Sequence, residues 1–447
     1  MTEKFNGKLM LPLALGAMLN PINSSMIAVA LVPIGLAFGA PASQTAWLVS
    51  ALYVATAIGQ PIVGKLVDTF GPRRLFMIGT TLVGLAGVLA LWAPNFWWLV
   101  VARVILGFGT TSGYPAAMYL IKKESARTGE QNPQWVMSLL ALSAQTAAVV
   151  GPVLGGFLIG AFDWRAIFSV NIPLSIIALI SGMLILPRDK AVAKDLKLDY
   201  AGMSVFALTL IVALVFLLMP SWTTAPLVLV TVLLGWLFVR IENSQVAPFV
   251  NLRVLAGNGP LVRTYLRVLL LMTTGYSFMY GWAQWLQTGR HLSETLSGTM
   301  MMPQMLTGIL IVAVFGRVKG VYWRMILAGV AQFVAMLGVL LSNGQSPLWF
   351  LLVIPALFGI TQGVGGLGNQ QAVFAQANPD EIGAASGLQR TFMYVGAMLG
   401  GAANGLFQNT NQPDFGMHEI AGISLSLSVV MLLLTWFDRG ILKGIGR

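Results

Sequence analysis

Long apolar runs, separated by short polar connections, make up almost the whole sequence. Each run has about 17–25 residues, the length that a helix needs to cross a hydrocarbon core. Because lipid offers the backbone no hydrogen-bond partner, such runs are expected to be helices. The pattern predicts an all-α polytopic membrane protein with about fourteen spans, near residues 9–38, 45–64, 75–93, 96–121, 134–160, 165–186, 200–219, 224–241, 263–287, 294–316, 325–342, 347–373, 382–407 and 417–437.

The basic residues divide the polar connections into two classes. If the N-terminus is cytoplasmic, the connections on the opposite side contain only Arg165 and Arg290, whereas those on the cytoplasmic side contain most of the other bases. Lysine and arginine are retained on the cytoplasmic side of membrane proteins. We therefore predict a multi-pass protein of the cell inner (cytoplasmic) membrane with both termini in the cytoplasm.

Two charged connections, 187–199 and 242–260, enclose a pair of spans. Without this pair, six spans precede and six follow, and the fifth span of each group contains the pattern V-G-x-x-L-G-G-x-x-x-G, at 150–160 and at 395–405. Inverted or parallel repeats of this kind are typical of alternating-access transporters. Two unrelated stripes of small packing residues are the alternative. The predicted domains are an N-terminal six-helix bundle (1–186), a linker with two extra transmembrane helices (187–260) and a C-terminal six-helix bundle (261–447).

Composition supports the membrane assignment and excludes several functions. The chain is 57% hydrophobic and 9% charged, with a net charge of +11. Because the bases cluster at the ends of apolar runs, they are expected to face anionic lipid headgroups, and no nucleic acid partner is expected. The chain has no cysteine and only two histidines, and no phosphate-binding G-x-x-x-x-G-K-S/T pattern. We therefore expect no metal site, no cofactor and no ATP-driven pump.

Four local patterns resemble one transporter family. They are G-x-L-x-D-x-x-G-x-R-R at 64–74, R-x-x-x-G-x-G at 103–109, G-P-V-L-G-G at 151–156 and W-R-x-I-F-x-x-N-x-P at 164–173. In this order and spacing they resemble the major facilitator superfamily, and more narrowly its fourteen-span drug/proton antiporter branch. The resemblance implies two six-helix bundles plus two extra central helices. It also implies proton-coupled export of small hydrophobic or drug-like molecules by alternating access.

The first and third patterns provide candidate moving parts. In the first, Asp68, Arg73 and Arg74, with Gly64 and Gly71, are expected to form a gate that holds one side closed. The alternative is a charged turn that only fixes topology. The corresponding second-half connection, 316–324, has bases but no acid. In the third, Gly151, Pro152, Gly155 and Gly156 are expected to form a hinge or a tight interface between domains, with simple packing as the alternative.

One position departs from the family pattern. Asn23 occupies the place where the branch usually has an aspartate, and an amide cannot carry a proton. None of the fifteen acids lies in mid-span. The alternative function is therefore a facilitator, or an exporter of anionic metabolites, that moves no protons. A membrane sensor or enzyme is the non-transport alternative, for which no catalytic group or signalling domain is evident.

Polar residues inside the spans are candidates for coupling or substrate binding, because such groups must pair or line water. If Arg103 and Arg390 face a central cavity, that cavity disfavours cations. Arg267 is expected to extend to the headgroups. The expected partners are a small-molecule substrate, protons and the lipid bilayer, in a monomer that is not an enzyme. The candidate coupling or substrate-binding residues are Arg103, Asn20, Asn23, Gln145, Tyr276, Tyr280 and Arg390.

Overall fold

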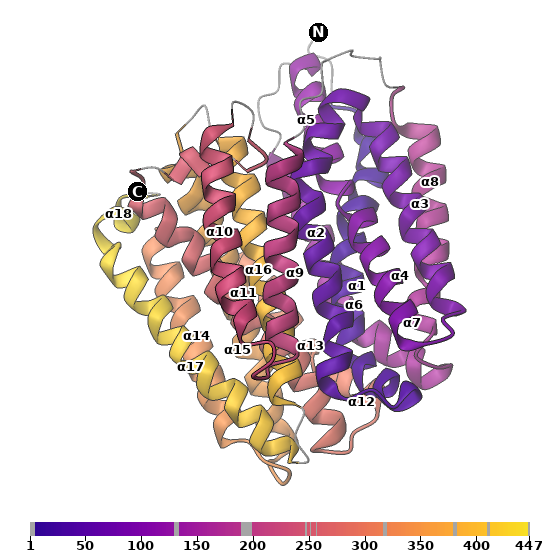
Figure 1. Ribbon diagram of the computed structural model, residues 1–447, viewed down its shortest axis with the longest axis vertical. Coiled ribbons are helices and arrows are strands. Elements are labelled where there is room, and N and C mark those ends of the chain that lie inside the picture. Colours follow the sequence, from indigo (N-terminus) through magenta and orange to yellow (C-terminus); the bar gives the residue numbers. More distant parts are fainter. Residues whose placement is uncertain are drawn as a thin grey trace.

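The computed structural model describes residues 5–128, 134–188, 199–245, 248–250, 252–255, 257–315, 320–378, 382–408 and 412–445, and these form helices and short connections (Figure 1). The first half contains η1 (Gly7–Leu9), α1 (Met10–Phe38), α2 (Ala42–Phe70), α3 (Pro72–Leu91), α4 (Phe96–Thr110), α5 (Gly113–Thr128), α6 (Gln134–Ala161), α7 (Ala166–Ser169) and α8 (Asn171–Ile185). Then come α9 (Tyr200–Leu218), α10 (Pro226–Ser244) and η2 (Leu252–Leu255). The second half contains α11 (Gly259–Thr288), α12 (Glu294–Thr299), α13 (Met302–Phe315), α14 (Val321–Leu341), α15 (Leu348–Gln376), α16 (Ile382–Phe407), α17 (Pro413–Phe437) and α18 (Arg439–Gly444).

The all-helical polytopic fold is confirmed. Eleven helices in the described part of the chain are long and apolar enough to cross a membrane. Three further helices, α6, α11 and α16, lie where other spans are predicted and have 28, 30 and 26 residues, but they are not among those eleven. The total of fourteen spans therefore stays a prediction.

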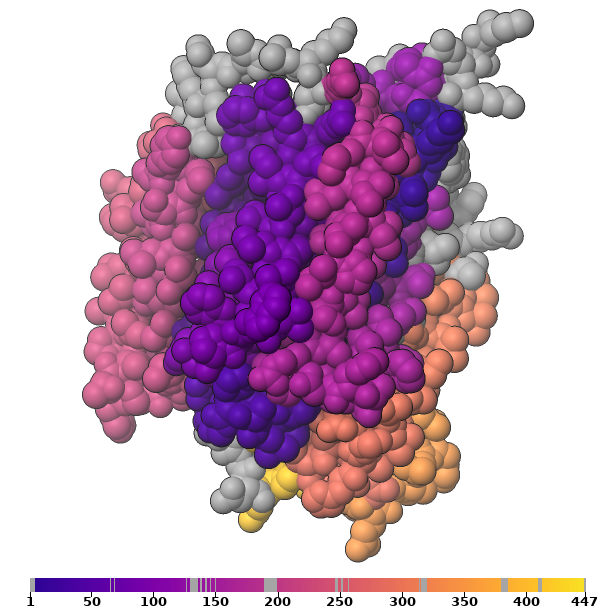
Figure 2. All heavy atoms as spheres, turned by 90° about the vertical axis from the view of Figure 1, so that its right-hand side faces the viewer, coloured from indigo at the N-terminus to yellow at the C-terminus, as the bar shows by residue number. Residues whose placement is uncertain are grey.

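Helix packing follows the two predicted groups. Within the first half α1 packs along α6, and α3 packs against α4 and α8; within the second, α11 packs along α16, and α14 against α15 and α17. The halves meet where α2 packs along α16 and where α6 packs against α12. The extra helix α9 packs on both α2 and α16, and α10 lies outside it, at the left edge of Figure 2. The domain boundaries themselves stay a prediction.

Both chain termini lie toward the same end of the helices (Figure 1). We call this the terminal end, and we call the opposite end, where α1 passes into α2 and α11 into α12, the distal end. In Figure 2 the segment of α12 and α13 lies directly below the first half at the distal end. This arrangement brings α12 under α6, which is the contact discussed below.

The first sequence pattern forms a tighter reversal than expected. Residues 64–70, expected to be part of a connection, continue α2, and the chain reverses at Gly71 alone, whose φ is +92°. Gly320, at the start of α14, has a φ of +104°. Because only glycine adopts such angles without strain, both halves place a glycine directly before the helix at Pro72–Leu91 or at Val321–Leu341. This match supports the internal repeat.

The prediction for Arg267 is wrong. Its side chain is fully buried, and its Nη1 lies 2.8 Å from Oδ2 of Asp438, which is also fully buried. Arg263 pairs with the other oxygen of the same carboxylate. The pair joins α11 to the end of α17. A buried guanidinium without a counter-charge is strongly destabilising, and here Asp438 provides that counter-charge inside the bundle.

Candidate functional site

Four tyrosines meet between the two halves. Tyr53 lies in the central part of α2 (Ala42–Phe70). Its ring centroid lies 5.2 Å from that of Tyr276 and 6.3 Å from that of Tyr394. Tyr276 in turn stacks on Tyr280, one turn further along α11. We call these four residues the tyrosine cluster.

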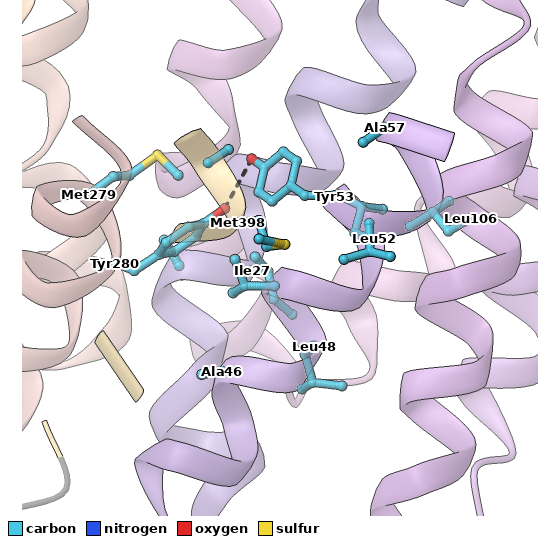
Figure 3. Close-up of a cluster of buried hydrophobic side chains, with 14 of the residues drawn as sticks. Ile27, Ala46, Leu48, Leu52, Tyr53, Ala57, Leu106, Met279, Tyr280 and Met398 are labelled. Atoms are coloured by element: carbon cyan, nitrogen blue, oxygen red, sulfur yellow. Dashed lines mark hydrogen bonds between the residues drawn. The ribbon is translucent and has the colours of Figure 1, made fainter. Parts of the chain in front are cut away.

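A hydrogen-bond chain crosses the cluster. The Tyr280 hydroxyl donates to the Ser24 carbonyl of α1 over 2.9 Å, so the Tyr53 hydroxyl, 3.2 Å away, is the donor to Tyr280 (Figure 3). Tyr53 and Tyr280 are both fully buried, whereas Tyr276 and Tyr394 are half-buried. The structure thus brings the predicted residues Tyr276 and Tyr280 together with two tyrosines that sequence reasoning missed.

Arg103 lies inside the first half. Its Nε donates to the Leu48 carbonyl over 2.7 Å and its Nη1 to the Asn23 carbonyl over 3.3 Å, while Nη2 has no partner among the described residues. Its side chain is only 1% exposed. Arg103 therefore ties α4 to α1 and α2 through backbone carbonyls, one of the ways in which a cation is accommodated in a membrane protein.

Asn23 pairs with a second amide. Its Nδ2 donates to Oδ1 of Asn171 over 2.6 Å and to the Leu19 carbonyl over 2.8 Å, while Nδ2 of Asn171 donates back to Oδ1 of Asn23 over 2.8 Å. Both side chains are buried. Each amide thus donates to the other, and neither side chain of the pair has a titratable proton. Asn171 lies in the W-R-x-I-F-x-x-N-x-P pattern, and that pattern is the signal that could have found it.

Asn23→Asp is expected to make transport depend on a pH gradient. An ionised aspartate would place an acceptor oxygen against the Asn171 and Leu19 oxygens, so only the protonated acid restores the present donor. The measurement is substrate counterflow in liposomes with and without an imposed gradient. Asn23→Leu, which removes the pair without adding an acid, is the control. A variant Asn23→Asp whose transport ignores the gradient contradicts this prediction.

Two other predicted polar residues have different fates. Asn20 donates from Nδ2 to the hydroxyls of Thr110, at 3.0 Å, and Thr56, at 3.4 Å, so it joins α1 to α4 and α2. Gln145 lies on α6, but its side chain is outside the described residues. Asn20 is half-buried, and both of its hydroxyl partners lie in the first half.

Arg390 contacts the opposite half directly. Its guanidinium carbon lies 3.3 Å from the ring centroid of Tyr114, on α5. It precedes Tyr394 by four residues, about 6 Å along a helix. Arg390 is half-buried. This residue therefore places a positive charge beside the tyrosine cluster, one helical turn toward the terminal end.

The repeated glycine pattern has two faces. Its second and sixth positions pack within their own half: Gly151 and Gly155 lie against α1, and Gly396 and Gly400 lie against α11. A Cβ on Gly155 would lie 3.0 Å from the Met26 carbonyl oxygen, and one on Gly400 would lie 2.7 Å from that of Thr273. The missing side chains let each pair of helices approach at backbone distance.

The seventh and eleventh positions pack on the other half. Gly156 and Gly160 lie against Glu294 and Thr295 of α12, and Gly401 and Gly405 lie against α2. The Thr295 hydroxyl also donates to the Gly156 carbonyl over 2.9 Å. We call these two contacts the distal seams, because both lie in the distal parts of their helices. The two copies of the pattern thus hold the two halves together in the distal parts of these helices.

The predicted hinge and gate residues are only partly described. Pro152 lies within α6, which continues as a helix to Ala161, and its backbone faces Gly298 of α12. Arg73 donates from Nη2 to the Met183 carbonyl, near the end of α8, over 2.8 Å. The side chain of Asp68 lies outside the described residues. Arg74 follows Arg73 in α3, and Gly64 has open space around it. The gate and hinge roles remain predictions.

A groove opens at the distal end, between α1, α2, α11 and the start of α17. Its volume is about 460 Å³, and its lining is mainly apolar, with Gln284, Thr288 and Gln408 among the polar residues. Gln284 lies one helical turn from Tyr280. The groove therefore comes within one helical turn of the tyrosine cluster along α11.

Paired helical halves, a repeated glycine pattern and a polar cluster between the halves are typical of polytopic membrane transporters. Residues 13–401 match the family model of the Major Facilitator Superfamily, and the chain belongs to that family. It is therefore a multi-pass membrane protein from a family of transporters rather than of enzymes.

Comparisons with individual proteins agree with this assignment. The chain is 31% identical to the uncharacterized MFS-type transporter YwoD of Bacillus subtilis (strain 168), over 97% of this chain and 95% of that protein. It is 29% identical to the lincomycin resistance protein of Streptomyces lincolnensis, over 96% and 91%. Among solved structures, a variant of the nucleoside transporter NupG shares the fold, with a TM-score of 0.68, 14% identity and coverage of 97% and 99%.

Proposed function

We propose that this protein exports small, largely apolar, drug-like molecules from the cytoplasm by alternating access. The observation that carries the proposal is the position of the tyrosine cluster, which lies between the halves and next to two distal seams built from one repeated pattern. Opening those seams would connect the cluster to the distal groove. Resistance and export proteins among the relatives support the substrate class.

The direction of transport rests on the predicted orientation. With both termini in the cytoplasm of a cell bounded by its inner membrane, the distal end faces outward. Molecules would enter from the terminal end, bind beside the tyrosine cluster and leave through the distal groove. The protein would act as a monomer, because one chain contains both halves of the repeat.

The proton coupling implied by the resemblance has no carrier at Asn23, which is held in an amide pair. Asp414 lies in the first turn of α17, Asp438 directly follows that helix, and Glu124 lies in the last turns of α5. Proton antiport is therefore one proposed mode of coupling, and export without proton movement is the other. The specific observation in favour of the second is the satisfied Asn23–Asn171 pair.

Counterflow in liposomes tests the proposed function. Purified protein is reconstituted, the liposomes are loaded with a panel of neutral, anionic and cationic drug-like molecules, and the entry of labelled tracer is followed with and without a pH gradient. We expect saturable exchange of at least one class of compound. Tracer entry no faster than in empty liposomes, for the whole panel, contradicts the proposal.

A further inference from the structure

Arg390 is a cation without an acidic partner in the part of the chain that the structure describes. Other arginines among the described residues have acidic partners: Arg127 pairs with Glu124, Arg165 with Asp163, and Arg263 and Arg267 with Asp438. Within that same part, Arg390 lies over the ring of Tyr114 and one helical turn from Tyr394. A charge among membrane-spanning helices ordinarily pairs with an opposite charge, or marks the path of a substrate or ion.

Its surroundings suit a ligand with an acid group and an apolar body. Tyr394 lies one helical turn from Arg390, and Tyr394 and Tyr276 both lie beside Tyr53. The rings of Tyr276 and Tyr394 are half-buried, and each has a flat apolar face with a hydroxyl at its edge. Arginine presents several donors in one plane, which match the oxygens of a carboxylate, sulfonate or phosphate. Arg103, by contrast, donates to two backbone carbonyls, and its side chain is buried inside the first half.

We propose that the substrate is an amphiphilic organic anion, whose acid group binds Arg390 while its apolar body lies against Tyr276 and Tyr394. The proposal rests on the proposed export function and specifies its substrate class. The interaction of Arg390 with Tyr114 joins α16 to α5, one from each half. An anion that neutralises the guanidinium weakens its attraction to the ring face. Binding is thus coupled to separation of the halves on the terminal side of the cluster.

An anionic substrate also explains how export proceeds without a proton carrier. The cytoplasm is electrically negative, so the membrane potential drives anions outward. At 100 mV the potential supports roughly a fifty-fold gradient for each negative charge moved. Neutralising Arg390 during binding keeps the occupied site uncharged as the halves rearrange. Export of anions would therefore respond to the membrane potential and not to pH.

The test uses two probes that share one ring system. Naphthalene-1-sulfonate is a permanent anion, and trimethyl(1-naphthyl)ammonium is a permanent cation of similar shape. Each is offered to liposomes that contain the full-length protein and carry a potassium diffusion potential of either sign. The variants are Arg390→Gln, Arg390→Lys and the control Arg240→Gln. Arg240 also lies over an aromatic ring, that of Trp236, but on the exposed side of α10.

We expect the wild type to move the anion toward the electrically positive side of the membrane. Arg390→Gln should lower the initial rate of this movement at least tenfold. Arg390→Lys should keep part of the rate, and Arg240→Gln should keep all of it. Movement of the cation at the rate of the anion, or anion movement unchanged in Arg390→Gln, overturns the anion proposal while export stands. Movement of neither probe nor any compound of the counterflow panel overturns both proposals. If Arg390→Gln fails to fold, the comparison of the two probes in the wild type still decides.

Discussion

Asp438→Asn is expected to destabilise the second half by about 3–5 kcal/mol. The change leaves the fully buried Arg267 guanidinium without a counter-charge, close to a second arginine, Arg263. Arg267 keeps its hydrogen bonds to the Leu434 carbonyl and the Thr264 hydroxyl, but these neutral acceptors do not compensate a buried charge. The measurement is thermal unfolding of the purified variant in detergent, together with its yield in the membrane.

Two variants control this prediction. Asp163→Asn breaks the ion pair with Arg165, in which both side chains are about half exposed, and it should cost no more than about 1 kcal/mol. The double change Arg267→Met with Asp438→Asn removes both charges, and it should recover much of the lost stability. Equal losses in Asp438→Asn and Asp163→Asn would show that the buried pair is not what holds α11 to α17.

Gly156→Ala is expected to reduce transport about tenfold, because it penalises the state in which the distal seams are closed. An added Cβ would lie 3.0 Å from the Glu294 carbonyl carbon and 3.1 Å from the Thr295 Cα, so two backbones must separate. The halves should remain folded, since the contact lies between them. Initial rates of counterflow and thermal unfolding are measured on the same preparation.

Neighbouring glycines separate the two faces of the pattern. Gly155→Ala acts inside the first half, against Met26 and Val29, and should lower the unfolding temperature more than Gly156→Ala does. Gly422→Ala is the control, because a Cβ there meets nothing within 4 Å. We assign Gly155 to packing inside the first half and Gly156 to the contact between the halves. This assignment is wrong if the two variants lower the unfolding temperature equally and reduce the transport rate equally.

The sequence predicts the positions of the helices well and their contacts poorly. Hydrophobic length locates a span because the bilayer sets that length. In lipid, however, the packed side of a helix is as apolar as the exposed side, so the pattern does not show which face meets another helix. The repeat at 150–160 and 395–405 was found from its letters, whereas its division between two neighbours required the structure.

The missed residues are those whose partners lie far along the chain. Asn171 is 148 positions from Asn23, and Asp438 is 171 positions from Arg267. No local spacing reports such pairs, so the sequence did not show that Arg267 has a buried acidic partner. Tyr53, Tyr114 and Tyr394 looked like ordinary apolar-run residues. One local signal was present, since Tyr394 follows Arg390 by one helical turn.

Cross-linking of a distal seam tests the central claim, that the two halves separate at the distal end during transport. The chain has no cysteine, so a double variant carries only the introduced pair. A Cβ on Gly160 would lie 3.8 Å from the Thr295 Cβ, which is the spacing found in disulfides. We expect Gly160→Cys with Thr295→Cys to lose counterflow when oxidised and to regain it on reduction. Complete cross-linking with unchanged counterflow would contradict the account.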